Sequence, residues 1–313
     1  MLPECGTTGL VFRLTGRYLA IKDAPVRIIE TTDGLARWEP DSVALLDVPY
    51  PTLTAVLAEH GRLEPLASAP VRDRRELDQV RHSRPGVGSV WGVGLNYRSK
   101  ALRTGRALPI EPILFLAPPV AVAAADSTVV VPATMTAEMD YEAEIGFVVG
   151  ATIYQASADQ VWPALAAVTA VNDMTARDVM RNTGVPTLAK GFPGFKPLGS
   201  SYASLDELRD PECIRVRSWV NDELRQDDTS AGMIFAVPDL IARLSQFVPL
   251  HPGDVVITGT PAGTGQDRGE FLADGDTVRI EVDAVLPLLT RVVAPPHLSS
   301  TTASALVGHT HDH

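Results

Sequence analysis

The chain has 313 residues, of which 45% are hydrophobic and 21% charged, as in globular proteins with a sizeable core in one large or two unequal domains. A formal net charge of −11, without any basic stretch, argues against nucleic-acid binding. No apolar run is long enough to span a bilayer, no signal-peptide pattern opens the chain, and two distant cysteines, Cys5 and Cys213, suggest no disulfide framework, so we expect a cytoplasmic protein without a membrane segment.

Residues 1–85 predict a small α/β accessory domain. The apolar runs at residues 10–14 and 26–29 favour strands. Residues 52–59 predict a short helix, with Thr52 as its N-cap and Gly61 at its end. The dipeptide Pro85-Gly86 then predicts a boundary before the next strand.

Residues 86–295 predict a β-rich unit. Short β-branched runs separated by Pro and Gly favour strands at residues 90–94, 127–131, 145–149, 214–220, 254–257 and 277–282. Asn221-Asp222 predicts a hairpin turn. Helices are predicted at residues 159–167, where Pro163 interrupts the pattern, at 174–181 and at 238–247. Because strands and helices do not alternate, a β-rich α+β barrel or roll is favoured over a doubly wound sheet. The Ser/Thr/His-rich residues 296–313 predict a disordered tail, whose histidines could bind a metal only adventitiously.

Two glutamates introduce the strand predicted at residues 145–149. Residues i and i+2 of a strand point to the same face, so Glu142 and Glu144 aim two carboxylates at one place. Such close like charges repel unless a proton or cation lies between them. A hard divalent cation with oxygen ligands fits, and Asp173 could supply a third carboxylate. The alternative is an exposed edge strand with two solvated glutamates.

Downstream residues carry charges that suit an anionic ligand. If residue 173 opens a helix, then Asp173, Arg177 and Met180 share one helical face. Arg177 could then clamp a substrate carboxylate, or simply form a weak surface ion pair at i,i+4. Lys190 stands among apolar residues and Gly in a chain with only 4 lysines. It could neutralise an oxyanion or exchange a proton, because desolvation lowers a lysine pKa.

The Gly- and Thr-rich segment 258–265 follows the strand predicted at residues 254–257. Its backbone N–H groups and hydroxyls could bind a carboxylate or an enolate oxygen. It lacks the Gly-Lys-Ser/Thr of a phosphate loop. The alternative is an ordinary Gly-rich turn.

Taken in order, these motifs resemble the fumarylacetoacetate hydrolase family, in particular its members of the acylpyruvase and oxaloacetate decarboxylase type. The resemblance covers about residues 90–292, which lie in the expected catalytic domain at 86–295. Its main matching segments are Gly94-Leu95-Asn96-Tyr97, Tyr141-Glu142-Ala143-Glu144, Asn172-Asp173-Met174-Thr175-Ala176-Arg177-Asp178, Leu188-Ala189-Lys190-Gly191-Phe192, Val220-Asn221-Asp222-Glu223-Leu224-Arg225-Gln226 and Thr258-Gly259-Thr260-Pro261-Ala262-Gly263.

The resemblance implies a mixed β-sandwich or β-roll, found as a homodimer, in which Glu142, Glu144 and Asp173 hold Mg²⁺ or Mn²⁺. Lys190 would lie beside the ion and the substrate oxygens. The substrate, a small carboxylate or dicarbonyl, would be bound by Arg177, Thr260, Gly259, Tyr97, Met180 and Gln226.

The chain departs from the family in the segment after Tyr97. Hydrolytic members carry a His and, three residues later, a Glu that activate water. Here Lys100 and Arg103 take those positions, so a base pair becomes a cationic pair. Met180 and Pro193 also replace polar residues of close relatives, which makes the pocket less polar.

These departures favour an enzyme other than an ordinary hydrolase. We expect a metal-dependent lyase or isomerase that acts on a 2-oxo acid or 1,3-dicarbonyl through a metal-stabilised enolate, with Lys190, Lys100 and Arg103 as its catalytic residues. One alternative is a conventional hydrolase of carbon–carbon bonds. The other is a non-catalytic member that binds a small acid.

Overall fold

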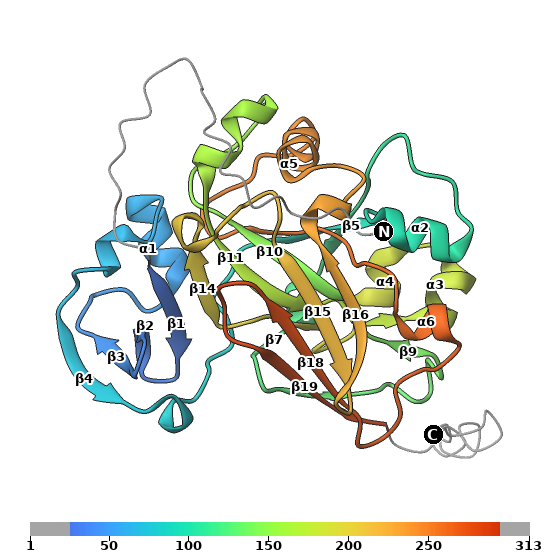
Figure 1. Cartoon of the computed structure of the whole chain (residues 1–313), viewed down its shortest axis with the longest axis horizontal. Coiled ribbons are helices and arrows are strands. Elements are labelled where there is room, and N and C mark those ends of the chain that lie inside the picture. The colour runs from blue at the N-terminus through green and yellow to red at the C-terminus, as the bar shows by residue number, and fades with distance from the viewer. Residues whose placement is uncertain (1–25, 295–313) are drawn as a thin grey trace, which may run out of the picture.

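The computed structural model describes residues 26–294 (Figure 1). Its largest sheet has the strand order β4-β3-β2-β1-β14-β11-β10-β17-β5-β6. All neighbours are antiparallel except β17 and β5. The bounds are β1 (Arg27–Thr31), β2 (Gly34–Glu39), β3 (Ser42–Leu46), β4 (Val71–Arg75), β5 (Val90–Gly94), β6 (Ile113–Ala117), β10 (Ala143–Val149), β11 (Leu165–Asn172), β14 (Ser201–Ser204) and β17 (Val255–Ile257).

A second sheet has the order β16-β15-β18-β19-β8, and its bounds are β8 (Thr128–Val130), β15 (Arg215–Val220), β16 (Glu223–Thr229), β18 (Thr277–Val282) and β19 (Leu288–Val293). It packs against β10 and β11, as Figure 1 shows. One apolar cluster, which includes Phe147, Val168, Val216 and Ile280, fills the space between the sheets. The predicted β-rich sandwich is therefore confirmed.

The helices are α1 (Leu53–His60), α2 (Arg98–Thr104), α3 (Arg177–Thr183), α4 (Pro186–Lys190), α5 (Val237–Ser245) and α6 (Gly265–Arg268). Two short ribbons pair β9 (Met139–Asp140) with β12 (Thr175–Ala176) and β7 (Val122–Ala123) with β13 (Lys196–Pro197). Figure 1 shows α2, α3, α4 and α6 gathered at one side of the molecule. Within residues 26–294, no helix is long and apolar enough to cross a membrane.

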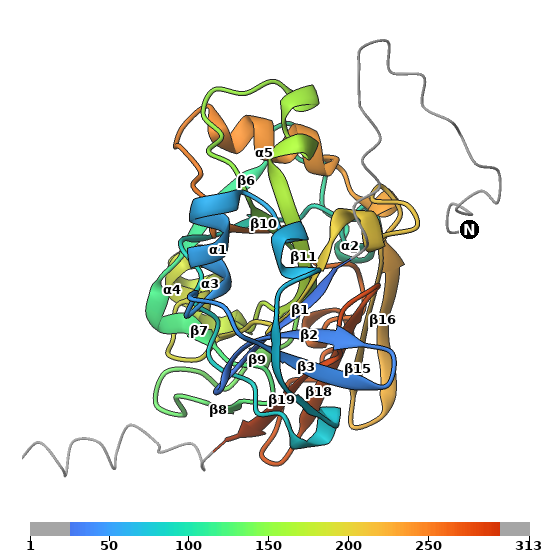
Figure 2. The same ribbon diagram turned by 90° about the vertical axis from the view of Figure 1, so that its left-hand side faces the viewer.

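The N-terminal strands β1, β2 and β3, which lie together in Figure 2, extend the main sheet, because β1 pairs with β14. Buried Glu30 joins this edge to its neighbours. Its carboxylate accepts hydrogen bonds from the N–H of Leu53 at 2.8 Å and from the hydroxyl of Tyr202 at 2.9 Å. The strand predicted at residues 10–14 and the tail at 296–313 lie outside the described residues.

Several predicted elements are confirmed with their local signals. The helix predicted at 52–59 is α1; Thr52 Oγ1 accepts a hydrogen bond from the N–H of Ala55, and Gly61 adopts a left-handed φ of 70°. The strand predicted at residues 90–94 is β5. Asn221 and Asp222 form the turn between β15 and β16, with φ of 49° and 67°, the backbone of a tight hairpin.

Two predicted helices are wrong in type or extent. Residues 159–167 form two short 3₁₀ turns, Ala158–Gln160 and Trp162–Ala164, and then enter β11. This buried strand lacks alternation because both its faces are covered, so its sequence also suits a helix. The helix predicted at 174–181 begins only at Arg177 in α3, since Thr175–Ala176 pairs with β9 instead. Asp173 therefore does not open a helix.

Candidate active site

The three predicted metal ligands converge at the centre of the main sheet. Glu142 precedes β10, Glu144 lies within it, and Asp173 follows β11. The antiparallel register pairs Ala143 with Asn172, which brings these segments together. All three carboxylates are buried, and one oxygen from each lies within 4.8 Å of the other two. The alternative of solvated glutamates on an exposed strand is thus wrong.

The donor set suits a hard divalent cation. The three converging groups are all carboxylates, whose oxygens are ligands that Mg²⁺ and Mn²⁺ prefer. Asp173 Oδ1 is buried and forms an ion pair with Lys196, and because a carboxylate oxygen has two lone pairs, it can face this cation and still coordinate an ion. Glu144 Oε2 accepts a hydrogen bond from the N–H of Gly259 at 2.7 Å. Gly259 has a φ of 87°, which favours glycine there, and a Cβ would meet the Cβ of Asn96 at 2.9 Å.

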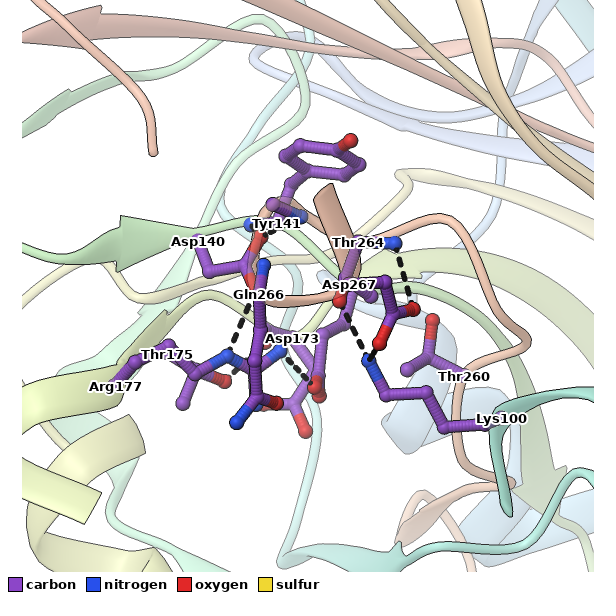
Figure 3. Close-up of polar contacts among 12 residues, drawn as sticks. Lys100, Asp140, Tyr141, Asp173, Thr175, Arg177, Thr260, Thr264, Gln266 and Asp267 are labelled. Carbon is purple, nitrogen blue, oxygen red and sulfur yellow. Dashed lines mark hydrogen bonds and ion pairs between the residues drawn. The ribbon is translucent and has the colours of Figure 1, made fainter. Parts of the chain in front are cut away.

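Arg177 lies at one side of the acidic cluster, at the start of α3 (Figure 3). Its Nε donates to Asp140 Oδ2 at 2.7 Å and its Nη2 to Glu142 Oε1 at 2.5 Å. Asp140 also accepts the N–H groups of Gly265 and Gln266, at 2.6 and 2.9 Å. The i,i+4 pair with Asp173 is therefore not formed. Within residues 26–294, the hydrogen bonds of this guanidinium come from Nε and Nη2, and its contact with an anionic ligand stays a prediction.

Lys190 ends α4 and reaches between two of the predicted metal ligands. Its Nζ donates to Glu142 Oε2 at 2.5 Å, Asp173 Oδ2 at 2.6 Å and Thr175 Oγ1 at 2.8 Å. Burial disfavours its charge, but Asp173 and Glu142 overcome that effect and raise the pKa of Lys190. The expectation that desolvation lowers this pKa is wrong, because Lys190 carries its own counter-charges.

Burial acts to raise the pKa of both glutamates, but their neighbours shift the two pKa values in opposite directions. Burial alone would raise the pKa of Glu142, but the neighbouring cations, Arg177 and Lys190 foremost, overcome it and lower that pKa. Glu144 forms no ion pair within residues 26–294. Burial and the charges of Asp173 and Glu142 raise the pKa of Glu144 well above its ordinary value. Of the two, Glu144 is therefore the carboxylate that lacks a counter-charge.

Lys100 and Arg103, the two cations of helix α2, occupy different environments; we call this helix the lid. Lys100 is buried in α2 and points toward the site from the side opposite Arg177 (Figure 3). Its Nζ donates to Thr264 Oγ1 at 2.5 Å and Asp267 Oδ1 at 2.8 Å. Burial and the charge of Arg177 lower the pKa of Lys100. Arg103 is exposed and donates to the backbone carbonyl of Asp267 at 2.9 Å.

The other predicted substrate-binding residues are held mainly by the protein itself. Thr260 Oγ1 donates to the carbonyl of Ala143 at 2.9 Å and accepts from Gln226 Nε2 at 2.8 Å. Tyr97 is fully buried, and its hydroxyl has no hydrogen-bond partner among residues 26–294. Met180 is half-buried on α3. Their contact with a substrate stays a prediction.

Three charged residues of this site escaped the sequence analysis as site residues. Asp140 anchors Arg177, Asp267 pairs with Lys100, and Lys196 pairs with Asp173 Oδ1. Burial lowers the pKa of Lys196, while its ion pair with Asp173 acts in the opposite direction. The rarity of lysine in this chain was the one signal that pointed to Lys196.

The family model for the C-terminal domain of fumarylacetoacetate (FAA) hydrolases matches residues 89–293. The chain therefore belongs to the fumarylacetoacetate hydrolase family. It is 34% identical over 277 residues to a 4-hydroxyphenylacetate degradation bifunctional isomerase/decarboxylase of Escherichia coli, covering 86% of this chain and 63% of that protein.

An oxaloacetate tautomerase of Bacillus subtilis is 32% identical over 204 residues, which cover 64% of this chain and 68% of that protein. A solved 2-hydroxyhepta-2,4-diene-1,7-dioate isomerase from Mycobacterium marinum superposes with a TM-score of 0.70 and 27% identity. That match covers 87% of this chain and 99% of the other. These three relatives have isomerase, decarboxylase or tautomerase activities in their names, and a further relative, from Sphingomonas and 31% identical, is named a 2,4-didehydro-3-deoxy-L-rhamnonate hydrolase.

Proposed function

We propose that this protein catalyses keto–enol isomerisation or decarboxylation of a 2-oxo acid with the help of Mg²⁺ or Mn²⁺. The observation that carries the proposal is the convergence of Glu142, Glu144 and Asp173 within 4.8 Å. Buried cations lie beside these carboxylates, and helix α2 has no His or Glu that could act as a base. Glu142, Glu144 and Asp173 would hold the ion, which would supply a Lewis acid that favours the enolate form of the substrate.

The protein residues divide the remaining tasks. Arg177 Nη1 would bind the substrate carboxylate, since Asp140 and Glu142 already fix the orientation of the guanidinium. Lys190, held in its charged form, would stabilise negative charge on a substrate oxygen rather than act as a base. Lys100, whose pKa is lowered by burial, would take and return the proton at the carbon next to the keto group.

The absence of a lid carboxylate separates this proposal from ordinary hydrolysis. In the part of the chain that the structure describes, α2 contributes Lys100 and Arg103 toward the Asp267 segment and no His or Glu. Activated-water attack needs a base near the water, whereas enolisation needs only a group that exchanges one proton with the substrate carbon.

Parallel assays would test the proposal. Purified protein with Mg²⁺ would be given oxaloacetate, with tautomerisation and decarboxylation followed separately, and an acylpyruvate, with hydrolysis followed. We expect turnover of the 2-oxo acid and little hydrolysis, and loss of both when Asp173→Asn removes a ligand. Efficient acylpyruvate hydrolysis without enolisation would overturn the proposal in favour of a conventional hydrolase. No activity on either, with no metal bound, would favour a non-catalytic member.

A further inference from the structure

Lys196 is a fully buried lysine to which the proposed function gives no task. It begins β13, which pairs with β7 and so fixes its backbone. Its Nζ donates to the carbonyl of Lys190 at 2.8 Å and pairs with Asp173 Oδ1. Because Lys190 Nζ holds the other oxygen of Asp173 at 2.6 Å, each oxygen of this carboxylate faces an ammonium group.

The buried ion pairs form one row in which charges alternate. Each negative group touches a positive one, and the row contains three of each kind. Its order is Asp140, Arg177, Glu142, Lys190, Asp173, Lys196. The row is therefore neutral before any ion enters. Glu144 lies next to it as a fourth carboxylate with no ion pair among residues 26–294.

This charge balance limits the net negative charge that the protein alone offers to a divalent ion. A charge left unbalanced in a buried site is costly. An ion with two positive charges would be met by the neutral row and by the single charge of Glu144. One positive charge would remain, and a carboxylate substrate would neutralise it. Without the charge of Lys196, the protein would supply two net negative charges and would balance the ion by itself.

We propose that Lys196 makes the binding of the divalent ion depend on an anionic substrate, an inference that rests on the metal-dependent function proposed above. Lys196 is a positioning residue in this scheme, because it acts on the ion through Asp173 and touches no substrate. Coupling between two ligands is reciprocal, so the acid must also bind more tightly when the ion is present. An enzyme built this way assembles its ion site fully only around its substrate.

The wild-type protein gives the first test. Mn²⁺ affinity would be measured by calorimetry and by electron paramagnetic resonance of bound Mn²⁺, with and without oxamate. Oxamate is a monoanion shaped like a 2-oxo acid but has no carbon that can enolise. We expect it to tighten Mn²⁺ binding by about tenfold, within the range usual for coupled sites, whereas neutral oxamide should have no effect. Mn²⁺ affinity that is equal with and without oxamate would overturn the inference.

Two variants then test the residue. Lys196→Met removes the charge and the hydrogen bond to the Lys190 carbonyl, whereas Lys196→Gln removes the charge and keeps a donor there. In both we expect tighter Mn²⁺ binding without oxamate and a smaller effect of oxamate. Arg181→Gln is the control, because Arg181 is an exposed cation on α3 that pairs with Glu138. It should leave the coupling unchanged.

The outcomes separate this inference from the proposed function. If Mn²⁺ binds but Lys196→Gln behaves as wild type in affinity and coupling, the inference is wrong and the metal-dependent function stands. If the wild type binds no Mn²⁺ in either condition, the proposed function fails, and the inference fails with it. Should neither variant fold, a wild-type Mn²⁺ affinity that is equal with oxamate and with oxamide would still overturn the inference.

Discussion

At the scale of single residues, the buried charges of the site are stabilised by pairing with groups of opposite charge. Each buried cation near the predicted metal ligands has a carboxylate within hydrogen-bond distance, and two of them, Arg177 and Lys190, have two. Removing one partner of such a pair leaves the other uncompensated, which costs more than the pair itself contributes. The lid pair of Lys100 and Asp267 is the one that is most easily separated from the metal ligands, because neither residue contacts them directly.

We expect Asp267→Asn to lower the free energy of unfolding by about 3–5 kcal/mol, because it strands the buried ammonium of Lys100. Lys100→Met should be destabilising too. The double variant should be more stable than the sum of the two losses implies, since no unpaired charge remains. Urea unfolding of the four proteins would measure this. An exposed pair, Arg243 with Glu111, serves as the control and should show little coupling. Strict additivity at the lid pair would contradict the expected interaction.

At the scale of elements, the edge between β1, α1 and β14 depends on one buried acid. Glu30 is almost fully buried and serves as acceptor for both Leu53 and Tyr202. Burial raises the pKa of Glu30, although these hydrogen bonds oppose the rise. The folded protein thus binds a proton at Glu30 more tightly than the unfolded chain does.

The sign of this linkage makes a prediction for stability against pH. When the folded pKa exceeds the unfolded value, stability falls as pH rises from the unfolded pKa of 4.5 through the raised folded pKa. Glu30→Gln removes that titration, keeps an amide oxygen to accept the N–H of Leu53 and offers an NH₂ group that can donate to the hydroxyl oxygen of Tyr202. The variant should therefore gain stability relative to wild type as pH rises, by at most about 1.4 kcal/mol per pH unit. Urea unfolding at several pH values would show it. A wild-type-to-variant difference that does not change with pH would refute the role of Glu30.

At the scale of the whole molecule, one sheet joins the N-terminal strands to the strands that carry the site. The family match begins at residue 89, yet β1 pairs with β14. A core cluster with members such as Ile28, Leu57, Val148 and Tyr202 spans both parts. We therefore expect residues 26–85 to stabilise the site-bearing half through this shared sheet.

Deletion of the chain through residue 85 would test that dependence. It would uncover the edge of β14 and the buried ring of Tyr202, and an exposed edge strand promotes aggregation. We expect the shortened protein to elute as aggregates in size-exclusion chromatography and to lose its cooperative urea transition. A soluble, cooperatively unfolding fragment would show that the accessory part is a separate domain.

The sequence predicted local features well and long-range pairings poorly. Caps, the hairpin turn at Asn221 and the convergence of Glu142 with Glu144 follow from neighbours in the chain, so local rules sufficed. The sequence did not identify β11 as a strand, because a strand that is buried on both faces shows no period of two. The partners of Lys100 and Arg177 were missed since Asp267 and Asp140 lie 167 and 37 residues away in the chain. Spacing along the chain carries no signal for such contacts.

The central claim is that this site draws a proton from a 2-oxo acid while an ion holds the acid. It is tested most directly by proton NMR of 2-oxobutyrate in deuterated water with Mg²⁺. We expect wild-type protein to exchange the C3 protons for deuterium, and Glu144→Gln and Lys100→Met to lose the exchange. Wild-type protein that binds the ion and the acid, yet leaves the C3 protons in place, would contradict the account.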